Sequence, residues 1–189
     1  MNRRGRHEVK RLGPSGGFTL LEMLIAVVIL GILAMVIVPQ FSSSANDAKV
    51  SATKADLAAL RSAAENYYQS HSSVYPGAVT EDGNSTAITD PGVCATTFTD
   101  QLTKYTQANG MANANSANLT APLYGPYVKG STFPTNPFNN LNTVVCDTTT
   151  TDVTARSANN AYGWKFYSQT GSFIAADSGT SGGIAHTSY

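Results

Sequence analysis

The most apolar part of the chain lies near its start. Residues 18–38 read FTLLEMLIAVVILGILAMVIV, and this run of twenty-one residues contains a single charged side chain, that of Glu22. At about 1.5 Å of rise per residue, a helix of this length spans roughly 30 Å, which is the thickness of the hydrocarbon core of a bilayer. The pattern therefore predicts a transmembrane helix over residues 18–38.

A second helical pattern follows directly after Pro39. Alanines recur every three or four residues and mark one face of a helix, with Leu60 and Tyr67 beside them. We expect residues 39–70 to continue the first helix as an amphipathic segment with the alanine face against a core, and Pro39 to kink it. The alanines of this face are Ala45, Ala48, Ala52, Ala55, Ala59 and Ala63.

The remaining residues, 71–189, have the composition of a small head rich in loops. Turn-forming residues dominate from residue 71 to residue 100, which predicts a long loop. A short helix is expected over residues 100–107. The tail from Asp177 to Tyr189 is rich in Gly and Ser, and we expect it to be mobile.

The clearest strand signal is a hairpin near the end of the head. Residues 162–167 and 172–175 have strand-like patterns, and Ser-Gln-Thr-Gly between them forms a turn. Trp164 and Phe166 would then face the same side, toward the helix. The predicted fold class is α+β, with one long N-terminal helix packed on a small antiparallel sheet.

The distribution of charge predicts the orientation of the first helix. The sequence has 12 Lys plus Arg and 12 Asp plus Glu, and five of the basic residues lie within the first eleven positions. A basic leader over residues 1–17 stays in the cytoplasm, so the head would face outward. Nucleic-acid binding needs basic groups on a folded surface, and this pattern argues against a nucleic acid as the main partner.

Glu22 separates this N-terminus from simpler targeting segments. An ordinary secretory signal peptide has an apolar stretch of only about 7–15 residues, and a plain signal anchor needs no acidic residue. A carboxylate within an apolar span is costly and has a functional partner as a rule. A cut before Phe18 would create an α-amino group four residues from Glu22, and the two charges would then pair between neighbouring copies.

The sequence Gly16-Gly17-Phe18-Thr19-Leu20-Leu21-Glu22 resembles the processing site of type IV prepilins and type II secretion pseudopilins. The resemblance implies that a prepilin peptidase cuts after Gly17 and methylates the new N-terminus at Phe18. It also implies that Glu22 pairs with the N-terminus of a neighbouring subunit. Pro39 falls where many family members have a helix-bending proline.

The resemblance leaves two kinds of filament open. Residues 124–139, with Gly-Pro-Tyr and Asn-Pro-Phe-Asn, resemble major pseudopilins and favour a subunit of a type II secretion pseudopilus. The alternative is a type IV pilus subunit, which serves adhesion, motility or DNA uptake. Either would polymerise with itself and related minor subunits on an inner-membrane assembly platform, after residing in the bilayer. A third hypothesis is a periplasmic binding domain that is anchored singly and never polymerises.

The two cysteines, Cys94 and Cys146, both fall outside the membrane in this topology. An even count in an oxidising compartment predicts a disulfide between them. Many pilins carry such a bridge, whereas many major pseudopilins have none, so the cysteines favour the pilus alternative.

We expect neither an enzyme nor a resident cofactor. A Ser-His-Asp site needs a positioned histidine, whereas His71 lies in a predicted loop and His186 in the predicted mobile tail. Related major pseudopilins bind calcium in C-terminal loops, and Asp147, Asp152 and Asp177 offer oxygen ligands here. No spacing groups these three carboxylates, and we expect them to be solvated rather than to hold a metal.

Overall fold

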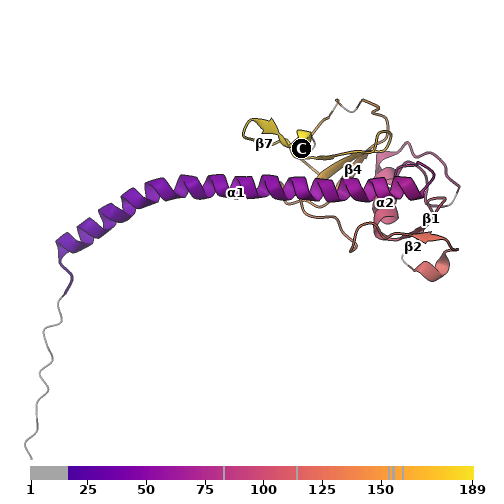
Figure 1. Cartoon of the computed structure of the whole chain (residues 1–189). Helices are drawn as coiled ribbons and strands as arrows, with labels where there is room; N and C mark the ends of the chain where they lie inside the picture. The colour runs from indigo at the N-terminus through magenta and orange to yellow at the C-terminus, as the bar shows by residue number, and fades with distance from the viewer. Residues whose placement is uncertain (1–16, 83, 114, 153, 155, 159) are drawn as a thin grey trace, which may run out of the picture. The chain divides into compact units, whose positions relative to one another are not determined.

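The computed structural model describes residues 17–189 except 83, 114, 153, 155 and 159. The basic cluster and Gly16 lie outside the described residues. The chain divides into two compact units, residues 1–44 and residues 45–189, and each is described separately. Helix α1 runs from Leu20 to Ser70 and stays helical through Pro39 (Figure 1).

Within the second unit, α1 contributes one face to the core. Its buried residues are Thr53, Leu57, Leu60, Ala63, Ala64 and Tyr67. The prediction that the alanine stripe packs against the core is wrong for five of its six members, because Ala63 alone is buried and the others are exposed. The larger side chains of Leu57, Leu60 and Tyr67 bury more apolar area than alanine, and they determine which face turns inward.

A second helix, α2, occupies Pro91–Thr103, so the predicted loop over 71–100 and the predicted helix over 100–107 are both wrong in their bounds. Asp90 caps this helix by accepting hydrogen bonds from the amides of Gly92 at 2.8 Å and Val93 at 3.0 Å. Asp at the cap followed by Pro in the first turn is a start signal that the composition of the segment concealed.

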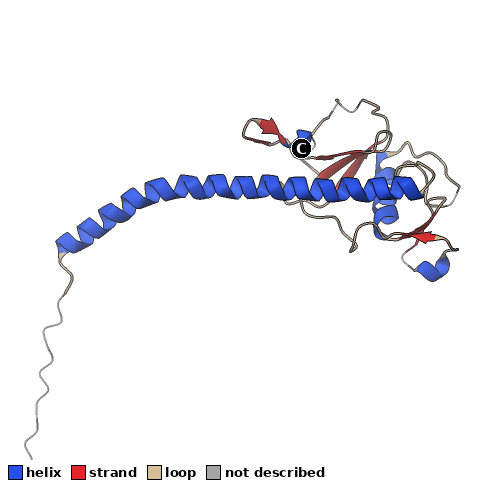
Figure 2. Cartoon of the chain, viewed as in Figure 1, coloured by secondary structure: helices blue, strands red, loops and turns tan. Residues whose placement is uncertain are grey.

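The central sheet has the order β4-β5-β6 (Figure 2). Its strands are β4 (Val144–Asp147), β5 (Trp164–Tyr167) and β6 (Ser172–Ala175). The predicted hairpin is confirmed: β5 and β6 are antiparallel, with Trp164 opposite Ala175 and Phe166 opposite Phe173. Strand β4 pairs with β5 in parallel, which the sequence pattern did not indicate.

Two smaller sheets and two short 3₁₀ helices complete the described part of the head. Strands β2 (Ala112–Asn113), β1 (Tyr105–Gln107) and β3 (Leu123–Tyr124) form an antiparallel sheet in that order. Strands β7 (Thr180–Ser181) and β8 (Ile184–Ala185) form a short antiparallel hairpin. The 3₁₀ helices are η1 (Ser116–Asn118) and η2 (His186–Ser188).

One hydrophobic core joins both helices to the central sheet. Phe98 of α2 lies at its centre, with ring centroids 4.4 Å from Phe166 and 5.8 Å from Phe173. Trp164 is fully buried in the same cluster as Leu57 and the other core residues of α1. The α+β class is confirmed: a long helix and a shorter one pack with small sheets.

The prediction of a mobile C-terminal tail is wrong. Asp177 and His186 are both buried, and the His186 ring stacks on Phe138 with centroids 3.6 Å apart. Arg61 of α1 donates hydrogen bonds to the carbonyl oxygens of Phe173, at 2.7 Å, and Tyr189, at 2.5 Å. Side-chain contacts with residues distant in sequence hold this segment, and its Gly/Ser-rich composition gave no sign of them.

Cys94 of α2 is disulfide-bonded to Cys146 of β4, with Cα atoms 5.8 Å apart and a sequence separation of 52 residues. Both cysteines are buried in the core cluster. The bridge therefore fastens the second helix to the edge strand of the central sheet.

Removing this bridge is expected to destabilise the head substantially. A closed loop of this length lowers the entropy of the unfolded chain, and the expected loss of unfolding free energy is about 4 kcal/mol. The measurement is thermal unfolding of the wild-type chain and of the Cys94→Ala, Cys146→Ala double variant, each with and without reductant. Reductant should lower the melting temperature of the wild type alone. Equal melting temperatures for the two proteins in oxidising buffer would contradict this prediction.

Candidate functional site

The segment that precedes α1 carries the predicted processing bond. Gly17, Phe18 and Thr19 have no regular secondary structure and are exposed. A Cβ atom added at Gly17 would meet no other atom within 4 Å. Among residues 17–44, the described part of the first unit, none covers the bond between Gly17 and Phe18, so a peptidase could approach it from this side without unfolding the helix.

Glu22 makes a specific local contact at the start of α1. Its Oε2 atom accepts hydrogen bonds from the backbone amide of Thr19 at 2.9 Å and from the Thr19 hydroxyl at 3.0 Å. The Thr19 hydroxyl oxygen in turn accepts from the Glu22 amide at 3.2 Å. This reciprocal arrangement is a capping box, which satisfies amide groups that the first turn of a helix leaves without partners.

The first turns of α1 expose an apolar surface all round. An eighteen-residue window of the helix has a mean hydropathy of 3.0, and none of that window is buried within the chain. Leu20 is 84% exposed and Met35 is 81% exposed. By length and composition, this one helix among the described residues can cross a membrane. An apolar face of this size needs lipid or the helices of other subunits around it.

The other predicted site residues lie farther along the chain than this first turn of α1. Pro39 lies inside α1, and Cys94 and Cys146 form the disulfide of the head. His71 lies in the turn that follows α1, as predicted, but it is buried there and stacks on Tyr67 with ring centroids 3.7 Å apart. Burial lowers the pKa of His71 and favours its neutral form.

The three aspartates considered for calcium each have different partners. Burial alone would raise the pKa of Asp147, but hydrogen bonds from Thr150, Thr149 and Lys165 lower it to about 2. Asp152 is exposed and accepts hydrogen bonds from the backbone amide and the hydroxyl of Thr154. Asp177 pairs with His186 and is buried, so the prediction that it is solvated is wrong. Among the described residues, no group of three or more His, Cys, Asp or Glu side chains could hold a metal ion.

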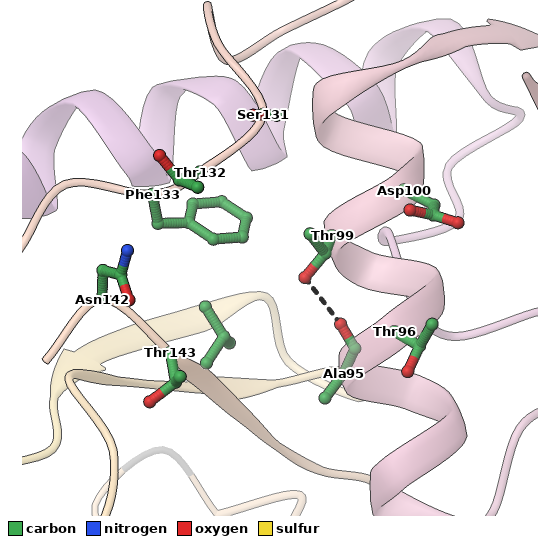
Figure 3. A pocket seen from close by; sticks show the side chains of 10 residues that line it. Ala95, Thr96, Thr99, Asp100, Ser131, Thr132, Phe133, Asn142 and Thr143 are labelled. Carbon is green, nitrogen blue, oxygen red and sulfur yellow. Dashed lines mark hydrogen bonds between the residues drawn. The ribbon is translucent and has the colours of Figure 1, made fainter. Parts of the chain in front are cut away.

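A cavity of about 370 Å³ lies between α2 and the segments around residues 131–133 and 142–144 (Figure 3). The Thr99 hydroxyl points toward the carbonyl of Ala95 and donates to it at 2.8 Å. Phe133 is almost fully buried beside it and stacks on Phe98. Since Trp164 also donates to the carbonyl of Pro134 at 2.7 Å, this proline-rich segment caps the core.

Comparisons with known proteins agree with the N-terminal geometry. Residues 14–38 match the model of the prokaryotic N-terminal methylation motif. The chain is 41% identical over 75 residues to the type II secretion system core protein G of Pseudomonas aeruginosa, covering 40% of this chain and 51% of that protein. It is 37% identical over 83 residues to the Vibrio cholerae protein of the same name, covering 44% and 55%.

The Klebsiella michiganensis protein of that name is 40% identical over 77 residues, which cover 41% of this chain and 52% of the relative. The chain thus spans about half the length of the curated relatives it matches. No solved structure matches the chain significantly.

An α+β head that follows one long, capped and lipid-compatible helix defines a pilin-like protein. With a match to the methylation motif over residues 14–38 and proteins named core protein G among its relatives, the chain is similar to type II secretion pseudopilins over part of its length. The apolar helix also fits a single-pass protein of the inner membrane.

Proposed function

We propose that the chain is a structural subunit of a type II secretion pseudopilus. The observation that carries this proposal is the methylation motif over residues 14–38, in a chain whose relatives are named type II secretion system core protein G. The protein is inserted in the inner membrane with its head in the periplasm. A prepilin peptidase cuts it after Gly17, and Phe18 becomes the methylated N-terminus.

Assembly then solves two energetic problems of the isolated chain. The exposed apolar side chains of α1 leave lipid and pack against the same helices of neighbouring subunits. Glu22 exchanges the Thr19 donors of its capping box for the positively charged N-terminus of a neighbour. Each charge offsets the cost of burying the other, so the pair favours the subunit in its correct axial position.

The role is architectural, and the proposal assigns no catalytic step to secretion itself. Partners are further copies of this chain, related minor subunits, the prepilin peptidase and an inner-membrane assembly platform. The Cys94–Cys146 disulfide favours a second candidate, a type IV pilus subunit exposed on the cell surface, because the resemblance associates such a bridge with pilins more than with major pseudopilins.

Deletion of the gene, followed by complementation with the wild-type chain, tests the proposal. The expected result is loss and recovery of a secreted protein in the culture medium, with mature subunits beginning at Phe18 and confined to the cell envelope. Mature subunits in filaments sheared from the cell surface, with unchanged secretion, would support the type IV pilus instead. Subunits that never form a sedimentable polymer would overturn both filament candidates.

A further inference from the structure

The C-terminal segment brings an aspartate, a histidine and a serine into a hydrogen-bonded line. The Ser181 hydroxyl lies 2.8 Å from Nε2 of His186, and Nδ1 of His186 contacts Oδ1 of Asp177. Asp177 lies two residues after the end of β6, Ser181 is in β7 and His186 begins η2. This is the order of contacts found in serine nucleophile sites, where the carboxylate orients the imidazole and the imidazole accepts the serine proton.

The surrounding donors decide which atom carries each proton. Asp177 also accepts hydrogen bonds from the amide of Gly179 at 3.1 Å and from the side-chain amide of Asn136 at 3.1 Å. The amide nitrogens of Gly179 and Asn136 both donate to Asp177, and a carboxyl group with these partners favours the Nδ1–H tautomer of His186 as its third donor. In neutral imidazole, Nε2 then offers its lone pair to the hydroxyl of Ser181.

Asn46 of α1 completes the orientation of the serine. Its side-chain amide nitrogen donates to the Ser181 oxygen at 3.1 Å. The Ser181 hydroxyl also lies 3.5 Å from the Oδ1 atom of Asn46, and its contact with Nε2 of His186, at 2.8 Å, is the shorter of the two. The same amide could donate to an oxygen that acquires negative charge beside Ser181.

The imidazole of His186 is held in place by its surroundings, whereas the side chain of Ser181 is accessible. His186 is only 3% exposed and Asp177 only 4%, and the Phe138 ring holds the imidazole by stacking. Ser181 is half-buried. The next two residues, Gly182 and Gly183, have φ angles of 58° and 80°, and a Cβ atom at either would meet nothing within 4 Å. The backbone that follows Ser181 therefore borders open space, which leaves room for an acyl donor on that side.

We propose that Ser181 is an activated nucleophile and a site of covalent acylation, which takes an acyl group from an activated ester. The serine oxygen forms a bond to the carbonyl carbon while its proton passes to Nε2 of His186. The bond from that carbon to the alcohol oxygen then breaks, and the leaving alkoxide takes the proton from His186. The products are an O-acyl serine and a free alcohol. The amide of Gly182, which follows the nucleophile directly, is placed in sequence to donate to the developing oxyanion.

This reactivity is separate from the filament role and does not depend on it. It gives a role to the buried, hydrogen-bonded pair of Asp177 and His186 in a segment rich in Gly and Ser. It also revises the reason for excluding nucleophilic chemistry, since His186 is fixed in place rather than part of a mobile tail.

The test uses the full chain in detergent and p-nitrophenyl acetate as the acyl donor. We expect release of p-nitrophenol to accompany transfer of one acetyl group, which peptide mass mapping places on Ser181. Ser181→Ala should remove this adduct. His186→Phe keeps an aromatic ring against Phe138 but provides no base, and it should slow acetylation of Ser181 by about 100-fold or more.

Ser178→Ala is the matched control, because Ser178 lies in the same segment but is exposed and hydrogen-bonded to Asn160 instead of a histidine. In this variant, p-nitrophenyl acetate should acetylate Ser181 at the wild-type rate. Near-UV circular dichroism checks that each variant is folded, and mapping of the wild type alone keeps the proposal testable if His186→Phe unfolds. No adduct on Ser181, or acetyl groups spread equally over exposed serines and lysines, would overturn the proposal.

Discussion

Replacing Glu22 with Gln is expected to prevent filament assembly while the protein is still produced, folded and cut after Gly17. The Gln side chain has a carbonyl oxygen that can accept the two hydrogen bonds from Thr19, so the capping box remains. Only the negative charge is lost. Leaving a partner's charge buried without its counterion costs about 3–5 kcal/mol, which corresponds to a loss of more than about 100-fold in the association constant at each contact.

A substitution that removes the hydrogen bond but keeps the negative charge provides the matched control. Thr19→Ala removes the hydroxyl that bonds to Glu22 but leaves the charge, and the expected cost is about 1 kcal/mol of local helix stability. The measurement is the fraction of subunit that crosslinks into multimers in membranes, compared among wild type, Glu22→Gln and Thr19→Ala. Thr19→Ala should assemble nearly as well as the wild type. Normal crosslinking of Glu22→Gln would show that Glu22 acts only as a helix cap.

The N-terminal half of the site could be predicted because its signals are local. A run of apolar residues, a basic leader and one acidic residue at a fixed distance from Phe18 lie close together in the sequence. The predicted α+β class and the β5–β6 hairpin depended on equally local patterns. The capping contact between Thr19 and Glu22 was also within reach, since Thr followed three residues later by Glu is its usual signature.

The fold of the rest of the head depends on long-range contacts, which the periodicity of apolar and polar residues does not indicate. Asp177 and His186 are ordered by each other and by Asn136, which lies 41 residues before Asp177 in the chain. The alanine stripe of α1 has a clear helical period, yet Leu57 and Leu60 determine the buried face. Parallel pairing of β4 with β5 likewise joins segments separated by a long connection, and no single pattern marks such a pair.

Replacing Gly17 with Val is expected to stop processing, so that the chain keeps its leader and lacks N-methylation. A Cβ atom at this position meets no atom of the described residues within 4 Å, and residues 17–19 are not helical. The substitution therefore leaves folding unchanged, and its effect must arise where the peptidase holds the bond before Phe18. An unprocessed chain retains a basic leader in place of the free amine that Glu22 requires, so assembly should fail as well.

The readout is the intact mass of the protein extracted from membranes, together with its N-terminal sequence. Gly31→Val is the matched control, because a Cβ atom at Gly31 also meets nothing within 4 Å but lies inside α1, well beyond the cleaved bond. It should yield a mature chain that begins with methylated Phe18. If Gly17→Val gives the same mature N-terminus, the peptidase cuts before Phe18 without requiring glycine at position 17, and the prediction is wrong. If both variants keep the leader, the defect lies in membrane insertion, because insertion is the step that the two substitutions share.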